Sequence, residues 1–324
     1  MCDLSKYYNI IMKKSILSCL ALVFTTLGFG QDSISSLEQK LTIDKFTDGT
    51  LILPENVVKP PLVIFIQGSG PVNRDGNAPM LKNDGMKKIS KDLADNGIAS
   101  FRYDKRIFKM NKFKIKEEDL TFNDFVFDLS NVIQYFQKEN NFSKIIVAGH
   151  SEGSLIGILG AQAETVDAFI SLAGAGRKID DIIVWQLFKQ SAELSENARI
   201  SFDEMKTNGS TSNYSPYLES IFRPSVQPYI NSWMKYDPAA EISKLDIPVL
   251  IINGSNDLQV DVKDAELLKE AKPDAKLVIL ENMNHVFRKI EGENLDNTKA
   301  YNEPARPLHP ELIPTMVEFV NSIK

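Results

Sequence analysis

The stretch Lys144-Ile-Ile-Val-Ala-Gly-His-Ser-Glu-Gly-Ser-Leu-Ile-Gly157 joins an apolar run, a serine between two glycines, and a series of small residues. The apolar run predicts a buried strand and the small residues predict a helix. A Gly-x-Ser-x-Gly turn between a strand and a helix holds its serine in a strained conformation with the hydroxyl exposed. Gly149 and Gly153 suit this turn because a Cβ atom at either position would collide with neighbouring backbone. The pattern predicts Ser151 as a nucleophile, with the N-terminal end of the helix directed at any oxyanion formed there.

A serine hydroxyl is a weak nucleophile at neutral pH and needs a general base, usually a histidine oriented by a buried carboxylate. The chain has three histidines. His150 adjoins the serine, but its side chain is expected on the other side of the turn in a packing role. His309 precedes Pro310 and is expected at the start of the last helix. His285 follows an apolar run and is predicted to reach the carboxyl edge of the sheet as the base.

The carboxylate of the triad should also follow the end of a strand. The run Ile247-Pro-Val-Leu-Ile-Ile-Asn-Gly-Ser-Asn-Asp-Leu-Gln-Val260 places Asp257 in a loop directly after one. Asp261 is the alternative, although it lies closer to the next helix, where an aspartate is an ordinary N-cap. We therefore prefer Asp257, and the resulting chain order is Ser, Asp, His.

The rest of the chain alternates between strand and helix patterns. A hairpin is predicted around Thr47-Asp-Gly49 between Leu41 and Leu53. Strands are predicted over residues 62–66, 98–103, 168–172, 247–252 and 277–280, and helices over 86–94, 122–137, 262–270 and 310–323. Such alternation is typical of an α/β protein with a doubly wound, mostly parallel sheet.

This alternation stops between Arg177 and Leu245, where the sequence predicts helices and is rich in aromatic residues. We interpret residues 177–245 as a helical cap inserted between a first core segment, 31–176, and a second, 246–324. A cap inserted after a strand would lie over the carboxyl ends of the strands, where open α/β sheets bind ligands. Trp185 and Trp233 are candidate pocket-lining residues, although such aromatics also form the core of an insert.

The chain resembles the α/β-hydrolase superfamily, in its branch of bacterial esterases and serine-aminopeptidase-like hydrolases. The resemblance covers the chain from about Leu62 onward. It rests on the motifs Gln67-Gly-Ser-Gly-Pro71, Asn73-Arg-Asp-Gly76, Arg102-Tyr-Asp-Lys-Arg106, Gly149-His-Ser-Glu-Gly153, Gly254-Ser-Asn-Asp-Leu-Gln-Val260 and Asn284-His-Val-Phe287.

The resemblance implies an oxyanion hole formed by the backbone N–H groups of Ser69 and Glu152, with no metal and no cofactor. Two positions depart from the family pattern: Gln67 replaces the usual histidine, and Ile107 replaces the glycine expected after Arg106. A further motif offers Arg74, Asp75 and Asp104 as ion-pair partners near the site, although an ordinary surface pairing is the preferred interpretation.

These features predict a serine hydrolase that cleaves carboxylic esters of small or medium acyl groups by an acyl-enzyme mechanism. An exopeptidase related to aminopeptidases, or an acyltransferase, could use the same triad. An aminopeptidase must bind a free ammonium, for which Asp180, Asp181 and Glu219 are available in the cap. A non-catalytic binding module is the least favoured reading, because the elbow and the triad are both intact.

Composition narrows the range of partners. The net charge of −6 and the pI near 5.3 argue against nucleic acid, because no basic stripe is left to neutralise phosphates. The lysine-rich run from Lys105 to Lys116 is expected to be a solvated loop without a function. The sequence predicts a small-molecule ester as substrate and no stable membrane span, and it leaves the oligomeric state open.

The N-terminal residues have the pattern of a secretory signal peptide over residues 1–30. Lys13 and Lys14 precede an apolar run, and Gly28-Phe-Gly30 provides small residues for cleavage. Cys19 raises the alternative of a lipoprotein, but the apolar run mostly follows this cysteine. Because Cys2 and Cys19 both fall in the removable segment, the mature chain is expected to have no thiol. We expect an exported protein, periplasmic or secreted, from a bacterium.

Overall fold

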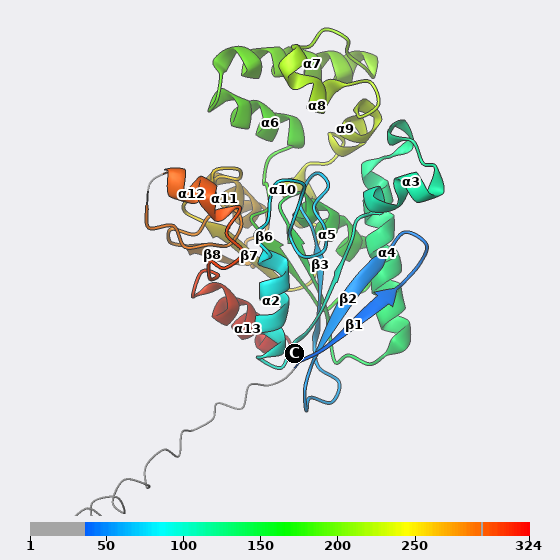
Figure 1. Cartoon of the computed structure of the whole chain (residues 1–324), viewed down its shortest axis with the longest axis vertical. Coiled ribbons are helices and arrows are strands. Elements are labelled where there is room, and N and C mark those ends of the chain that lie inside the picture. Colours follow the sequence, from blue (N-terminus) through cyan, green and yellow to red (C-terminus); the bar gives the residue numbers. More distant parts are fainter. Residues whose placement is uncertain (1–35, 293) are drawn as a thin grey trace, which may run out of the picture. The chain divides into compact units, whose positions relative to one another are not determined.

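The computed structural model describes residues 36–292 and 294–324, and the expected signal peptide lies outside these residues. The described residues form an eight-stranded sheet in the order β1-β2-β4-β3-β5-β6-β7-β8 (Figure 1). β2 runs antiparallel to its neighbours β1 and β4, and the other pairings are parallel. The strands are β1 (Ser36–Thr42), β2 (Asp48–Pro54), β3 (Leu62–Ile66), β4 (Ala99–Tyr103), β5 (Ile145–His150), β6 (Ala168–Leu172), β7 (Val249–Gly254) and β8 (Lys276–Leu280). The predicted doubly wound, mostly parallel sheet is confirmed.

Helices cover both faces of this sheet. Because side chains alternate along a strand, Leu62 and Ile64 of β3 pack on one face while Val63 and Phe65 pack on the other. The first face is covered by α4 (Phe122–Glu139), α5 (Glu152–Ala163) and α11 (Val262–Ala271). The second face is covered by α2 (Gly85–Ala94) and α13 (Leu312–Ser322). Strands buried on both faces explain the continuous apolar runs in the sequence.

The predicted strands and helices match the observed ones to within a few residues, but α12 (Asn294–Ala300) was not predicted and one further segment differs. Residues 105–116 were expected to form a solvated loop. They instead contain η1 (Arg106–Lys109) and α3 (Met110–Phe113), followed by η2 (Glu117–Asp119). Lys105 and Arg106 are buried. Each has a carboxylate partner that compensates its charge: Lys105 faces Glu152, and Arg106 is paired with Asp128. The expectation of a solvated loop is therefore wrong at the start of this segment.

Between β6 and β7 the described chain is helical. This part contains α6 (Ile179–Phe188), α7 (Ala192–Asn208), η3 (Pro216–Leu218), α8 (Glu219–Phe222), α9 (Gln227–Trp233) and α10 (Pro238–Ile242). We call residues 177–245 the cap. Its helices α6 to α9 lie beyond the upper end of the sheet in Figure 1. Of the helices in the described part of the chain, none combines the length and apolar character that a membrane span requires.

Candidate active site

The elbow lies between β5 and α5, with Ser151 at the turn. Its φ of 55° and ψ of −120° place a residue other than glycine in a strained backbone conformation. A Cβ atom at Gly149 would lie 2.1 Å from the carbonyl oxygen of Gly153, and one at Gly153 would lie 2.5 Å from that of Ile66. Both glycines are required because backbone approaches them too closely for any side chain.

An acid–base pair lies in the loops after β7 and β8. The His285 Nδ1 atom is 2.7 Å from Oδ2 of Asp257, and both side chains are buried. The other oxygen of Asp257 accepts hydrogen bonds from the backbone N–H groups of Gln259, at 2.7 Å, and Val260, at 3.0 Å. These bonds fix the carboxylate so that it accepts a hydrogen bond from the Nδ1–H group of His285. The Nε2 lone pair of His285 is thereby left available for a serine proton.

Asp261, the alternative carboxylate, caps a helix and makes no hydrogen bond to His285 among the described residues. It is the N-cap of α11, where its side chain accepts a hydrogen bond from the backbone N–H of Lys263 at 3.0 Å. His309 is buried near the start of α13, and its Nδ1 accepts a hydrogen bond from the backbone N–H of Glu311. Both residues therefore have structural roles at helix starts.

His150 contacts the loop that carries His285. Its Nε2 lies 3.0 Å from the His285 carbonyl oxygen, and the two ring centroids are 4.6 Å apart. Burial lowers the pKa of His150 well below its usual value, and the neighbouring His285 lowers it further. A neutral ring can donate its Nε2 proton to this carbonyl. His150 therefore packs at the turn, as expected, and also holds the main chain of His285.

The residues expected to form the oxyanion hole adjoin the serine. A Cβ atom at Gly68 would lie 3.1 Å from that of Ser151, so the loop after β3 lies directly against the elbow. Ser69 and Glu152 line the same cavity as Ser151 and His285. Glu152 is the first residue of α5, so its N–H is among the helix-terminal donors that have no intrahelical partner.

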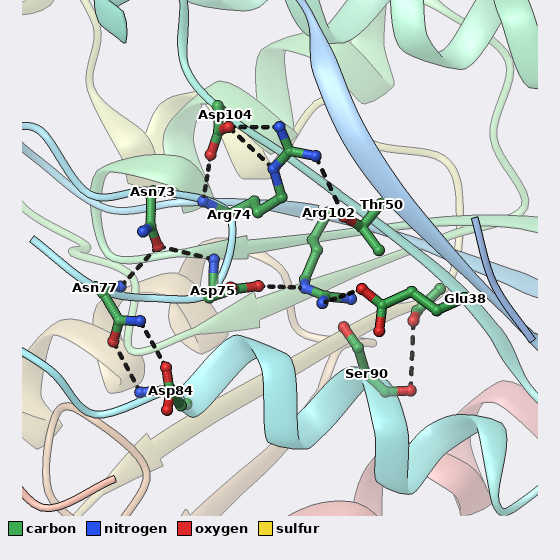
Figure 2. Close-up of polar contacts among 12 residues, drawn as sticks. Glu38, Thr50, Asn73, Arg74, Asp75, Asn77, Asp84, Ser90, Arg102 and Asp104 are labelled. Atoms are coloured by element: carbon green, nitrogen blue, oxygen red, sulfur yellow. Dashed lines mark hydrogen bonds and ion pairs between the residues drawn. The ribbon is translucent and has the colours of Figure 1, made fainter. Parts of the chain in front are cut away.

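Two ion pairs join the loop after β3 to β4 and to Asp104, the residue that follows β4 (Figure 2). Arg74 makes a bidentate contact with Asp104, with Nη2 at 2.5 Å and Nε at 2.9 Å from one oxygen, and its backbone N–H donates to the other. The Nε atom of Arg102 is 2.8 Å from Asp75, and the Arg102 side chain is only 1% exposed. These side chains are buried or only partly exposed, so the contacts are not the ordinary surface pairing that was expected from the sequence. Gln67, in the position usual for histidine, donates from Nε2 to the Arg74 carbonyl at 3.2 Å.

The site opens into a cavity of about 880 Å³. Its apolar lining comes from the core and the cap, and includes Phe125, Leu155, Ile183, Val226, Ile230 and Trp233. Trp185 is not part of this lining. Its ring instead contacts two cations: the Arg177 guanidinium lies 4.8 Å from the ring centroid, and Nζ of Lys189 lies 3.5 Å from it.

The sequence did not predict a buried lysine in this cavity. The Lys105 Nζ atom donates to the Gly68 carbonyl at 2.5 Å and lies 3.8 Å from Oε1 of Glu152. Burial lowers the pKa of Lys105, while Glu152 opposes the shift. Burial and the same carboxylate raise the pKa of Tyr229 well above its usual value. Two signals could have indicated a role at the site: Lys105 follows a predicted strand, and it belongs to the family-like motif Arg102-Tyr-Asp-Lys-Arg106.

The acidic residues considered for binding an ammonium do not line the cavity. Asp180 is 2.6 Å from both Arg199 and Lys206, and Asp181 is 2.9 Å from Arg199. Glu219 accepts a hydrogen bond from the hydroxyl of Tyr214. Within residues 36–292 and 294–324, no group of three or more His, Cys, Asp or Glu side chains is arranged to hold a metal ion.

The fold, together with an Asp–His pair whose histidine lines the same cavity as the elbow serine, defines an α/β-hydrolase of the esterase and peptidase-like branch. The chain belongs to the BD-FAE family, whose model matches residues 50–271, more than half of the chain. It is similar to esterase EstD of Thermotoga maritima, with 26% identity over 282 residues that cover 81% of this chain. The chain spans 63% of the length of that relative.

Two solved structures show the same fold. Est1E from Butyrivibrio proteoclasticus has a TM-score of 0.56 and 18% identity, covering 89% of this chain and 100% of that one. A puromycin-hydrolysing peptidase of Mycobacterium tuberculosis has a TM-score of 0.55 and 14% identity, covering 90% of this chain and 40% of that one. At these identities the likeness shows the fold alone.

Proposed function

We propose that the protein is a serine esterase in which Ser151, His285 and Asp257 act as a catalytic triad. The observation that carries this proposal is the 2.7 Å contact between His285 Nδ1 and Asp257 Oδ2. The contact orients the imidazole of His285 in a cavity that Ser151 also lines. Similarity to esterase EstD supports an ester as the substrate.

In the proposed mechanism, Nε2 of His285 takes the proton of Ser151 as Oγ attacks the ester carbonyl. The N–H groups of Ser69 and Glu152 stabilise the resulting oxyanion, and each such donor lowers the barrier by about 3 kcal/mol. The intermediate collapses as His285 protonates the leaving alcohol, which leaves the acyl group on Ser151. Water then attacks this acyl-enzyme, with His285 again accepting a proton, and the carboxylic acid is released.

The charges in the cavity favour esters over peptides with a free amino terminus. Two carboxylates line it, and each faces a cation: Glu152 lies 3.8 Å from Lys105, and Glu117 is paired with Arg223. An α-ammonium would have to compete with these cations for either carboxylate. The apolar lining suits an acyl group of small or medium size.

The proposal is tested by comparing p-nitrophenyl esters of graded chain length with aminoacyl p-nitroanilides, for the wild type and Ser151→Ala. We expect ester hydrolysis by the wild type, loss of turnover in Ser151→Ala with an unchanged melting curve, and little anilide hydrolysis. Faster turnover of the anilides would favour the exopeptidase. Acyl transfer to an added alcohol that exceeds hydrolysis would favour the acyltransferase. Substantial ester turnover by a folded Ser151→Ala variant would exclude this serine as the nucleophile.

A further inference from the structure

The triad does not use the buried ammonium of Lys105. We propose that Lys105 is a positioning residue of the oxyanion hole, which fixes and polarises the peptide group that joins Gly68 to Ser69. This inference rests on the proposed function, because it assigns a role within the same active site. It starts from the 2.5 Å hydrogen bond that Nζ donates to the Gly68 carbonyl.

The geometry of the peptide group connects this bond to the reaction. The carbonyl of Gly68 and the N–H of Ser69 belong to one planar unit, and in a trans peptide they point in opposite directions. There are no cis peptide bonds among the described residues. An ammonium on the oxygen therefore fixes the direction in which the Ser69 N–H points. It also draws electron density toward the carbonyl oxygen, which makes the N–H a stronger donor.

The surroundings show that this N–H is free to act. Among the described residues, no acceptor lies within hydrogen-bonding geometry of the Ser69 N–H. Gly68 lies directly against Ser151, because a Cβ atom at Gly68 would be 3.1 Å from that of Ser151. The peptide is therefore held beside the nucleophile with its donor unoccupied.

Burying the Lys105 ammonium lowers the free energy of unfolding unless other groups compensate the charge. Its side chain is 4% exposed, and transferring an ammonium out of water is unfavourable unless the charge is compensated. Its compensation is the carboxylate of Glu152, whose own backbone N–H is the second proposed donor. The ammonium also lies 5.8 Å from the centroid of the Phe125 ring. One side chain thus connects the two segments that carry the oxyanion donors.

The test uses two variants, because removing Lys105 alone would leave the Glu152 carboxylate buried and unpaired. Lys105→Met removes the ammonium, and Lys105→Met/Glu152→Gln also removes the opposite charge while keeping the backbone N–H of residue 152. The matched control is Lys109→Met, which removes a lysine of the same segment that pairs with Asp48 outside the cavity. Each protein is assayed for kcat, KM, melting temperature and the affinity of a trifluoromethyl ketone, which forms a tetrahedral adduct with an active-site serine.

We expect both Lys105 variants to lose about 10- to 100-fold in kcat, somewhat less than deletion of a whole oxyanion donor, with KM changed less than about threefold. Affinity for the trifluoromethyl ketone should fall by the same factor as kcat/KM, since that adduct uses the same donors. Lys109→Met should match the wild type. A wild-type kcat in the double variant would overturn the inference, as would a lower kcat with unchanged ketone affinity. If the wild type cleaves no ester, the proposed function fails as well.

Discussion

The ring of His150 is bonded to the main chain of His285, with Nε2 of one residue 3.0 Å from the carbonyl oxygen of the other. The residue before the nucleophile therefore helps to hold the loop of the proposed base. This bond requires a proton on Nε2, which a neutral imidazole provides. Burial keeps the pKa of His150 well below its usual value, so the ring stays neutral in the folded protein as the pH falls.

This burial predicts a pH dependence of stability. An unfolded histidine gains a proton below about pH 6.5, whereas the folded protein does not protonate His150 until a much lower pH. The unfolded state therefore binds more protons, and the free energy of unfolding falls by up to about 1.4 kcal/mol per pH unit as the pH drops below 6.5. Urea unfolding at pH 7.5 and pH 5.5 measures this loss. His150→Gln can keep the hydrogen bond to His285 and should show a smaller loss. An equal loss in both proteins would contradict the prediction.

Asp257 and Asp261 should differ sharply in their effect on the reaction. Asp257→Asn removes the charge that orients the ring of His285, and we expect kcat to fall on the order of 10³- to 10⁴-fold. Asp261→Asn should change kcat little, because asparagine is also a good N-cap for α11. Steady-state kinetics on one ester would rank the two variants. A larger loss for Asp261→Asn would transfer the assignment to that residue.

The strained backbone of Ser151 predicts that replacing this residue by glycine abolishes activity and stabilises the fold. At φ 55° and ψ −120°, a Cβ atom costs about 1–3 kcal/mol, whereas glycine adopts this region freely. Greater chain entropy in the unfolded state offsets about 0.5–1 kcal/mol of the gain. Ser151→Gly should therefore be inactive, yet more stable than Ser151→Ala by about 1 kcal/mol in urea unfolding. Equal stability of the two variants would show that the elbow stores no such strain.

The two tryptophans of the cap should affect substrate range differently. Trp233 lines the cavity, stacked on Phe122 at a centroid distance of 5.2 Å, whereas Trp185 lies outside the lining. Trp233→Leu keeps an apolar side chain against Phe122 and enlarges the cavity. It should shift preference toward longer acyl chains by about fourfold per added methylene, with turnover of acetate esters within about tenfold of the wild type. Trp185→Ala is the matched control. A shifted chain-length profile in Trp185→Ala, or none in Trp233→Leu, would contradict this assignment.

Much of the architecture could be predicted from the sequence because local patterns determine it. The continuous apolar runs at residues 62–66 and 145–150 follow from strands buried on both faces, and the elbow glycines follow from close backbone contacts. The Asp257 and His285 side chains could be paired because both follow strands that end at the same edge of the sheet.

What could not be predicted depends on partners that are distant in the sequence. Lys105 belongs to a basic run typical of a solvated surface, and its burial depends on the Glu152 carboxylate and the Gly68 carbonyl. Trp185 has the same character as Trp233 in the sequence, but its ring contacts the cations of Arg177 and Lys189 and does not line the cavity. Composition and periodicity carry no information about such pairings.

The position of the cap between β6 and β7 separates the proposed catalytic residues from part of the cavity lining along the chain. Ser151, Asp257 and His285 all lie outside residues 177–245, whereas Ile183, Ile230 and Trp233 of the cavity lining lie within them. One uninterrupted part of the gene thus encodes much of the surface that a substrate would meet. Substitutions confined to that part can therefore alter the cavity lining without changing the contact between Asp257 and His285.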